Sequence, residues 1–141
     1  MLKTLLAVDG SENSDRATQH LIKLVRQCGA TDVHVVNVQP VFLYIEVFLK
    51  PGQDVIDAWT HKAGKTAAHT ACSLLEAADI PYTLELTEGE IAETLVLYAK
   101  RLECELIVTG TRGMGTVANL LLGSVATKVI HMSHIPVTLV K

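Results

Sequence analysis

Short apolar segments alternate with longer amphipathic segments along the whole chain, and this alternation restricts the possible folds more than any other feature. Five segments have the length and composition of strands, namely residues 2–10, 32–38, 82–87, 105–110 and 135–141. Four segments between them predict helices, namely residues 11–29, 54–79, 90–102 and 124–132. Strands that alternate with helices favour a parallel sheet with helices on both faces, which is an α/β fold.

The apolar residues in the helical segments recur at steps of three and four, which indicates the face that each helix buries. In the first helix Ser11 or Asn13 can cap the start, and Gly29 ends it. The third helix is expected to turn Ile91, Leu95, Tyr98 and Leu102 inward. The long second helix is expected to bury a stripe made of Ile56, Trp59, Ala63, Ala67, Ala71, Leu74 and Ala78.

Composition predicts one globular domain that spans residues 1–141. Hydrophobic residues make up 49% of the chain and charged residues 19%, a balance that argues against disorder. The charges are uneven, because no Asp or Glu follows Glu105, whereas Arg112, Lys128 and Lys141 do. One end of the fold is therefore relatively positive. Three cations do not form a nucleic-acid-binding stripe, so no nucleic-acid partner is expected.

The cysteines and the apolar segments bear on the location of the protein. The three cysteines are widely spaced and form no CxxC pair, which is typical of reduced thiols in the cytoplasm. The first residues lack a signal-peptide cleavage pattern, and Gly, Pro and Lys interrupt the apolar C-terminal part. A cytoplasmic protein without a membrane segment is expected.

Residues 108–126 contain four of the nine glycines and no acidic residue, which suits a negatively charged ligand. In open parallel sheets, ligands bind beyond the carboxyl ends of strands, where the strand order reverses. Asp9 follows the first predicted strand, and Gly110 ends the fourth. If these strands are neighbours, the order is 3-2-1-4-5, whereas the order 2-1-3-4-5 would separate them. The positions of the motifs favour the first order.

Three phosphate-binding patterns can be compared with the glycine-rich segment. A Walker A loop fails, because Thr116 stands where the lysine is needed. Residues 113–118 fit the dinucleotide pattern GxGxxA, but they follow the fourth strand and no acidic residue lies downstream for a ribose. The third pattern is Gly110-x-x-Gly113, nine residues, then Gly123-Ser124, where a helix begins. Helix starts bind phosphate, and Ser124 is the expected N-cap.

This third pattern resembles the ATP-binding branch of the universal stress protein family. The likeness covers the whole chain, including "LLAVDGSENS", "ELIVTGTRGMG", "LLLGSVATKVI" and "IPVTLVK". It implies a Rossmann-like fold and a regulatory protein that binds ATP or AMP, with magnesium possible through the phosphates. One departure is Ala118-Asn119, where many relatives carry basic residues, and it implies weaker binding of the triphosphate relative to AMP.

The resemblance also implies roles for individual positions. Asp9 would hold the ribose, the backbone near Ala7 would lie beside the base, and the Val38 backbone would read the adenine edge. Gly110 would pack on the ribose. The phosphates would be wrapped by Arg112, Gly113, Met114, Gly115, Gly123, Ser124 and Val125. A branched side chain at position 113 should block the phosphates, and we expect Gly113 to adopt a positive φ.

Several alternatives remain open from the sequence. No catalytic or metal-ligating residue is expected, but a slow ATP hydrolase, an NAD-dependent oxidoreductase or a dimeric scaffold with an empty pocket would fit the same pattern. Residues 135–141 are predicted to form an apolar edge strand, through which the relatives imply a homodimer. Residues 41–49 would be either a lid or a partner surface. Leu120, Leu121 and Leu122 are expected to pack into the core.

Overall fold

The structure is a computed structural model that describes residues 1–40, 50, 52–113, 119 and 121–141. Its strands are β1 (Leu2–Ala7), β2 (Thr31–Gln39), β3 (Tyr82–Glu88), β4 (Leu106–Gly110) and β5 (Val137–Val140). Its helices are α1 (Glu12–Cys28), α2 (Gln53–Ala77), α3 (Ile91–Arg101) and α4 (Ser124–Met132). The prediction for residues 41–49 lies outside the described residues.

The five strands form one parallel sheet in the order β3-β2-β1-β4-β5, which confirms the predicted order. Strand β1 lies at the centre, where Leu6 is paired with Val35 on β2 and with Val108 on β4. The chain moves outward from β1 to β3, then crosses back to β4. The carboxyl ends of β1 and β4 are therefore neighbours at the point where the order reverses.

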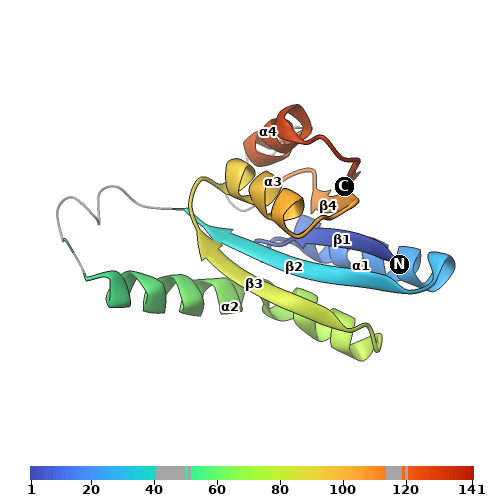
Figure 1. The fold of residues 1–141 in the computed structure, drawn as a ribbon, viewed down its shortest axis with the longest axis horizontal. Coiled ribbons are helices and arrows are strands. Elements are labelled where there is room, and N and C mark those ends of the chain that lie inside the picture. Colours follow the sequence, from blue (N-terminus) through green and yellow to red (C-terminus); the bar gives the residue numbers. More distant parts are fainter. Residues whose placement is uncertain (41–49, 51, 114–118, 120) are drawn as a thin grey trace.

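Helices cover both faces of the sheet, as the alternation predicts (Figure 1). On one face, α1 and α2 pack on β1, β2 and β4 through a buried cluster that includes Leu6, Leu21 and Leu75. On the other face, α3 and α4 pack through a cluster that includes Leu5, Leu95 and Val129. Burial of each such side chain contributes about 1.5–3 kcal/mol. No helix in the described parts of the chain has the length and apolarity to cross a membrane.

The first helix begins and ends as predicted. The Ser11 side chain accepts a hydrogen bond from the Ser14 backbone N–H at 3.2 Å and so caps α1. Gly29 follows the last turn with φ +88°, and its N–H donates to the Val25 carbonyl. A left-handed residue at this position favours glycine.

The predicted stripe of α2 is wrong before Ala71, whereas Leu74 and Ala78 pack against the core as expected, although they are only partly buried. The buried residues are Gly64, Ala68, Ala71 and Leu75, so only Ala71 belongs to both sets. Trp59 is 48% exposed, and the first half of α2 extends beyond the strands in Figure 1. Close contacts select the observed face, because a Cβ atom on Gly64 would lie 2.9 Å from Leu86 Cδ2.

The expectation that three consecutive leucines pack into the core is also wrong where it can be tested. Leu121 is 84% exposed, and Leu122 is half-buried. Leu120 lies outside the described residues. The turn before α4 is held by its backbone, since the Gly123 N–H donates to the Thr111 carbonyl at 2.6 Å.

Candidate functional site

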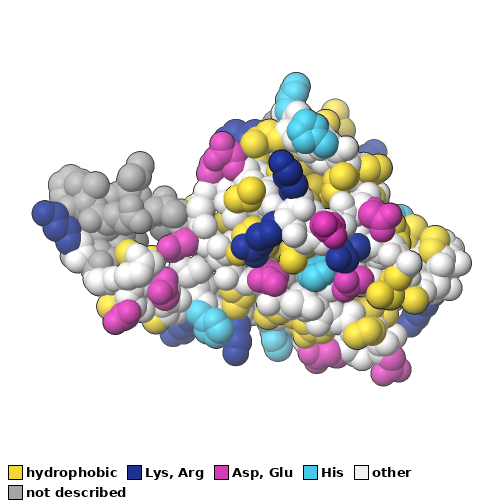
Figure 2. All heavy atoms as spheres, in the orientation of Figure 1, with side chains coloured by type: hydrophobic (Ala, Val, Ile, Leu, Met, Phe, Trp, Pro, Cys, Tyr) yellow, Lys and Arg dark blue, Asp and Glu magenta, His cyan; other side chains and the backbone are white. Residues whose placement is uncertain are grey.

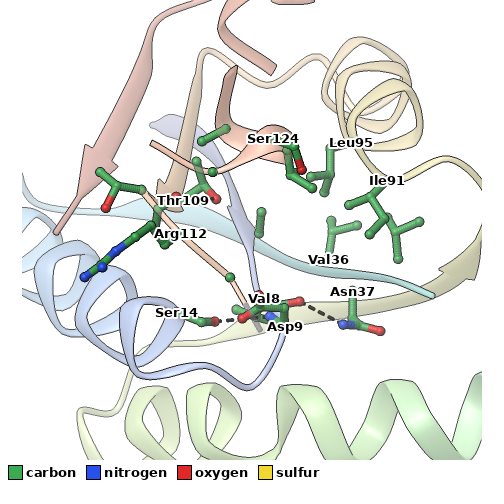
Figure 3. A pocket seen from close by; sticks show the side chains of 18 of the residues that line it. Val8, Asp9, Ser14, Val36, Asn37, Ile91, Leu95, Thr109, Arg112 and Ser124 are labelled. Carbon is green, nitrogen blue, oxygen red and sulfur yellow. Dashed lines mark hydrogen bonds between the residues drawn. The ribbon is translucent and has the colours of Figure 1, made fainter. Parts of the chain in front are cut away.

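A cavity of about 380 Å³ opens at the carboxyl ends of β1, β2 and β4 (Figure 3). It has the size of a small-molecule site. Nine predicted site residues line it, namely Ala7, Asp9, Val38, Gly110, Arg112, Gly113, Gly123, Ser124 and Val125. The other two, Met114 and Gly115, lie outside the described residues. Positions far apart in the sequence therefore meet around one cavity.

Asp9 is positioned by the turn that joins β1 to α1. Its Oδ1 atom accepts from the Ser11 N–H at 2.9 Å and from the Ser11 hydroxyl at 2.6 Å. Its own N–H donates to Ser14 Oγ at 3.3 Å. Gly10 makes the turn with φ +85°, a conformation that glycine adopts without strain. The carboxylate is thus held in one orientation at the rim of the cavity.

Gly110 and Gly113 allow the end of β4 to lie close to the start of α1 and to the turn that joins β1 to α1. A Cβ atom on Gly110 would lie 2.8 Å from Asn13 Cβ, so α1 packs directly against this strand end. A Cβ atom on Gly113 would overlap with Asp9 Oδ2. The expected positive φ at Gly113 is wrong, since the glycines with positive φ in the described chain are Gly10, Gly29 and Gly89. A side chain at position 113 would require the Asp9 carboxylate to move, whereas the backbone conformation there does not call for glycine.

The start of α4 faces the cavity without a side-chain cap. Gly123 is the N-cap, with φ −72° and ψ 164°, and its carbonyl accepts from the Thr127 N–H at 3.0 Å. The prediction that Ser124 is the N-cap is wrong by one position, because Ser124 already has helical conformation. Ser124, Val125 and Ala126 line the cavity. The first N–H groups of a helix lack intrahelical partners, and the positive end of its dipole attracts anions.

The opposite wall of the cavity is apolar. Val36 and Val38 of β2 and Ile91 and Leu95 of α3 line it. Figure 3 shows Val36, Ile91 and Leu95 on this side. Sequence reasoning assigned Ile91 and Leu95 to the buried stripe of α3 but not to the site. Their position on the inward face, directly after the end of β3, is the signal that could have placed them there. A flat apolar group would fit against this wall.

Several further polar residues line the cavity and were missed, namely Ser14, Asn37, Gln39, Thr109 and Thr111. Ser14, Thr109 and Thr111 lie within the segments that resemble the family, whereas Asn37 and Gln39 belong to no motif. The Ser14 hydroxyl accepts from the N–H of Asp9.

Acidic groups near the cavity are engaged elsewhere. Glu88 accepts from the Thr60 hydroxyl at 3.0 Å, and Glu90 caps α3 and lies 3.3 Å from Lys128 Nζ. Asp9 is the acid that lines the cavity within the described chain. In that same part, no group of three or more His, Cys, Asp or Glu side chains is arranged to hold a metal ion.

Comparison with known sequences finds universal stress proteins both among family models and among individual relatives. The sequence model of the universal stress protein family matches residues 1–141. Universal stress protein MJ0531 of Methanocaldococcus jannaschii is 30% identical over 99% of this chain and 81% of its own length. A universal stress protein of Thermus aquaticus is 31% identical, with 100% of both chains covered.

Solved structures share the fold. Hypothetical protein MJ0577 superposes with a TM-score of 0.83 at 24% identity, covering 99% of this chain and 95% of that one. A universal stress protein in complex with cAMP gives a TM-score of 0.71 at 23% identity, covering 99% and 97%. An Archaeoglobus fulgidus universal stress protein in complex with dAMP gives 0.68 at 23% identity, covering 100% and 98%.

Proposed function

Because this chain belongs to the universal stress protein family, we propose that it is a regulatory protein that binds an adenine nucleotide, ATP or AMP, in the cavity at the carboxyl end of the sheet. One observation carries the proposal. The same cavity joins a fixed carboxylate, an apolar wall and an uncapped helix start. These three groups suit a ribose, a base and a phosphate respectively. Two structures with the same fold were solved with cAMP and dAMP.

The proposed pose assigns each part of the nucleotide to one side of the cavity. The Asp9 carboxylate accepts hydrogen bonds from the ribose hydroxyls, and Gly110 packs beside the ribose. The base lies between Ala7 and the apolar wall, with its polar edge at the Val38 backbone. The phosphates lie at the N–H groups of Ser124 and Val125, near Gly113, Gly123 and Arg112.

The donor set fits phosphate oxygens, and magnesium would be held by those oxygens and water. Asp9 is the one lining carboxylate in the described residues, and its Oδ1 atom already accepts two hydrogen bonds from Ser11. We therefore propose that this chain supplies orientation and hydrogen bonds, whereas the metal neutralises phosphate charge when it is bound.

Identification of the bound ligand tests the proposal directly. Protein purified from cells is denatured, and the released small molecules are analysed by mass spectrometry. Calorimetry with ATP and AMP then compares the wild type with Asp9→Ala, and circular dichroism confirms the fold of the variant. We expect adenine nucleotide and weaker binding by Asp9→Ala. Release of NAD would instead support the NAD-dependent oxidoreductase. If neither ATP nor AMP bound, the alternative of a dimeric scaffold with an empty pocket would be favoured.

Hydrolysis of ATP is expected to be very slow or absent. Fast phosphoryl transfer needs a group that orients the attacking water and positioned charge on the phosphates. Glu88 and Glu90 are engaged in other contacts, and no acidic residue follows Glu105. Enzymes turn over at about 10 per second, and we expect a rate at least about a thousandfold lower. Phosphate release with ATP and magnesium measures it. Turnover near the enzymatic median that is lost in Gly113→Ala would make this protein an ATPase.

The remaining properties are proposed on separate grounds. Residues 1–141 act as a single nucleotide-binding unit that dimerises through the last strand. Acidic and basic side chains are interspersed on the face that Figure 2 shows, which supports the absence of a nucleic-acid partner. Cys28, Cys72 and Cys104 are free thiols, which supports a cytoplasmic location.

A further inference from the structure

Asn37 is an almost fully buried polar residue at the end of β2, and nothing in the proposed binding pose uses it. It is 2% exposed and lines the cavity. Its Nδ2 atom donates to the Val8 carbonyl at 2.8 Å, a bond that Figure 3 shows beside Asp9. Its Oδ1 atom accepts from Gln39 Nε2 at 2.9 Å. Because a carbonyl only accepts, the NH₂ group must be the one that faces Val8.

Helix α2 holds this side chain from the other side. A Cβ atom on Gly64 would lie 3.2 Å from Asn37 Oδ1 and 2.9 Å from Leu86 Cδ2. The backbone of α2 therefore approaches the amide closely, and a larger residue at position 64 would displace it. A buried amide whose bonds are made on both sides has one stable orientation.

The bond from Asn37 to Val8 stands where the backbone ladder between β1 and β2 ends. The last rung runs from the Val8 N–H to the Val36 carbonyl at 3.0 Å. Backbone groups alternate in direction along a strand, so those of Val38 point to the β1 side, as those of Val36 do. Consistently, the Gln39 carbonyl accepts from the Gly89 N–H, on the β3 side.

A regular parallel ladder would continue with a bond from the Val38 N–H to the Val8 carbonyl. That rung is not formed in the described structure, where Val8 accepts from the Asn37 side chain instead. Val38 is only 6% exposed and lines the cavity. Its N–H and carbonyl are thus directed at the space between the separating strands, which is where the base is placed in the proposed pose.

We propose that Asn37 is a positioning residue that determines the specificity for the base. By engaging the Val8 carbonyl, it ends the ladder one rung early and leaves the Val38 N–H and carbonyl available to a ligand. This inference rests on the proposed function of the site. One donor beside one acceptor matches N1 and the 6-amino group of adenine. Hypoxanthine presents N1–H and O6, the reversed pattern, and leaves both protein groups unpaired.

The test compares ATP with inosine triphosphate (ITP) by calorimetry. We expect the wild type to prefer ATP by at least about tenfold, because the reversed edge leaves buried polar groups unpaired. Asn37→Leu keeps the same branched side-chain skeleton but cannot donate, so the Val38 N–H can complete the ladder. Its affinity for ATP should fall about tenfold and that for ITP less than about twofold, so the preference should be lost. A merely structural role would weaken both equally.

Thr31→Val is the matched control. Thr31 is also a buried polar residue on β2, and its hydroxyl donates to the Gly29 carbonyl at 3.2 Å, but it lies at the opposite end of the strand. This variant should keep the full preference for ATP. Loss of the preference in Thr31→Val as well would show that any damage to β2 has this effect, and would overturn the role of Asn37.

A measurement on the wild type remains decisive if Asn37→Leu fails to fold. ATP should shift the amide proton signal of Val38 and slow its exchange with solvent, whereas ITP should do neither. Equal binding of ATP and ITP, or an unchanged Val38 amide, would overturn this inference while nucleotide binding stands. A wild type that binds neither ATP nor AMP would instead overturn the proposed function, and this inference with it.

Discussion

Gly113 lies against the Asp9 carboxylate. Because glycine has no side chain, it leaves the space that this carboxylate occupies. Asp9 Oδ2 lies where a Cβ atom on residue 113 would be, and Ser11 holds Oδ1. The carboxylate is therefore enclosed between the helix start and the glycine-rich segment. The two residues are 104 positions apart in sequence, yet they lie in contact at one side of the cavity.

Gly113→Ala should weaken ATP binding by about tenfold or more, a loss of about 1.4 kcal/mol, because the new methyl group displaces the Asp9 carboxylate. Calorimetry on the folded variant measures the effect. The double variant with Asp9→Ala should lose little more than Asp9→Ala alone, since both changes act on the same group. Additive losses would show that Gly113 acts on the phosphates independently of Asp9.

A charged contact joins the N-terminal end of α3 to the middle of α4. Glu90 caps α3 by accepting from the Glu93 N–H at 2.7 Å, and Lys128 of α4 lies 3.3 Å from its other oxygen. The Glu93 N–H, together with Lys128, lowers the pKa of the Glu90 carboxyl. The ionised form is therefore favoured in the folded state, and the residue after it, Ile91, lines the cavity.

Glu90→Gln should destabilise the protein by about 0.5–1 kcal/mol at pH 7, the usual cost of a weakened cap, since the half-exposed ion pair adds little. A lowered folded-state pKa gives stability that is present above the ordinary carboxyl pKa and is lost as the pH falls through the folded value. The difference between variant and wild type in urea unfolding should thus shrink toward acidic pH. A difference that stays constant with pH would assign the effect to packing.

The strand order could be predicted because Asp9 and Gly110, at the ends of two different strands, were expected to serve one site, which favours β1 and β4 as neighbours. The buried face of α2 could not be predicted, because the helix carries two stripes of small residues that are offset by one position. From the sequence, Ala63 and Ala67 are as suitable for burial as Gly64 and Ala68. The close contacts of Gly64 with Leu86 and Asn37 determine which stripe is buried. The role of Asn37 has no sequence signal either, since it depends on where two strands separate.

The sheet ends at β5, which pairs with β4 on one side and has an open edge on the other. The Val140 carbonyl accepts from the Thr111 N–H, and the Pro136 carbonyl from the Ile107 N–H, so both point toward β4. By alternation, the backbone groups of Leu139 point outward. Such an edge pairs readily with a second copy, and an antiparallel pair about a two-fold axis satisfies both.

Leu139→Pro should convert the proposed dimer into a monomer with a nearly unchanged melting temperature, because it removes only the outward N–H. Thr138→Pro is the matched control and should destabilise the fold, since its N–H faces β4. Light scattering and thermal unfolding distinguish the two. A Leu139→Pro protein that remains dimeric would place the interface elsewhere.

The pairing of Leu5 with Ile107 in the centre of the sheet has a consequence for the protein during synthesis. The chain must extend past the start of α4 before the cavity is complete, because β1 and β2 line one part of it and residues 109–113 and 123–126 line another. A growing chain that has completed only β1 to β3 has not yet formed this cavity. Contacts so distant in sequence form late and slowly. Under the proposed function, a nucleotide would therefore stabilise only chains that have completed the sheet.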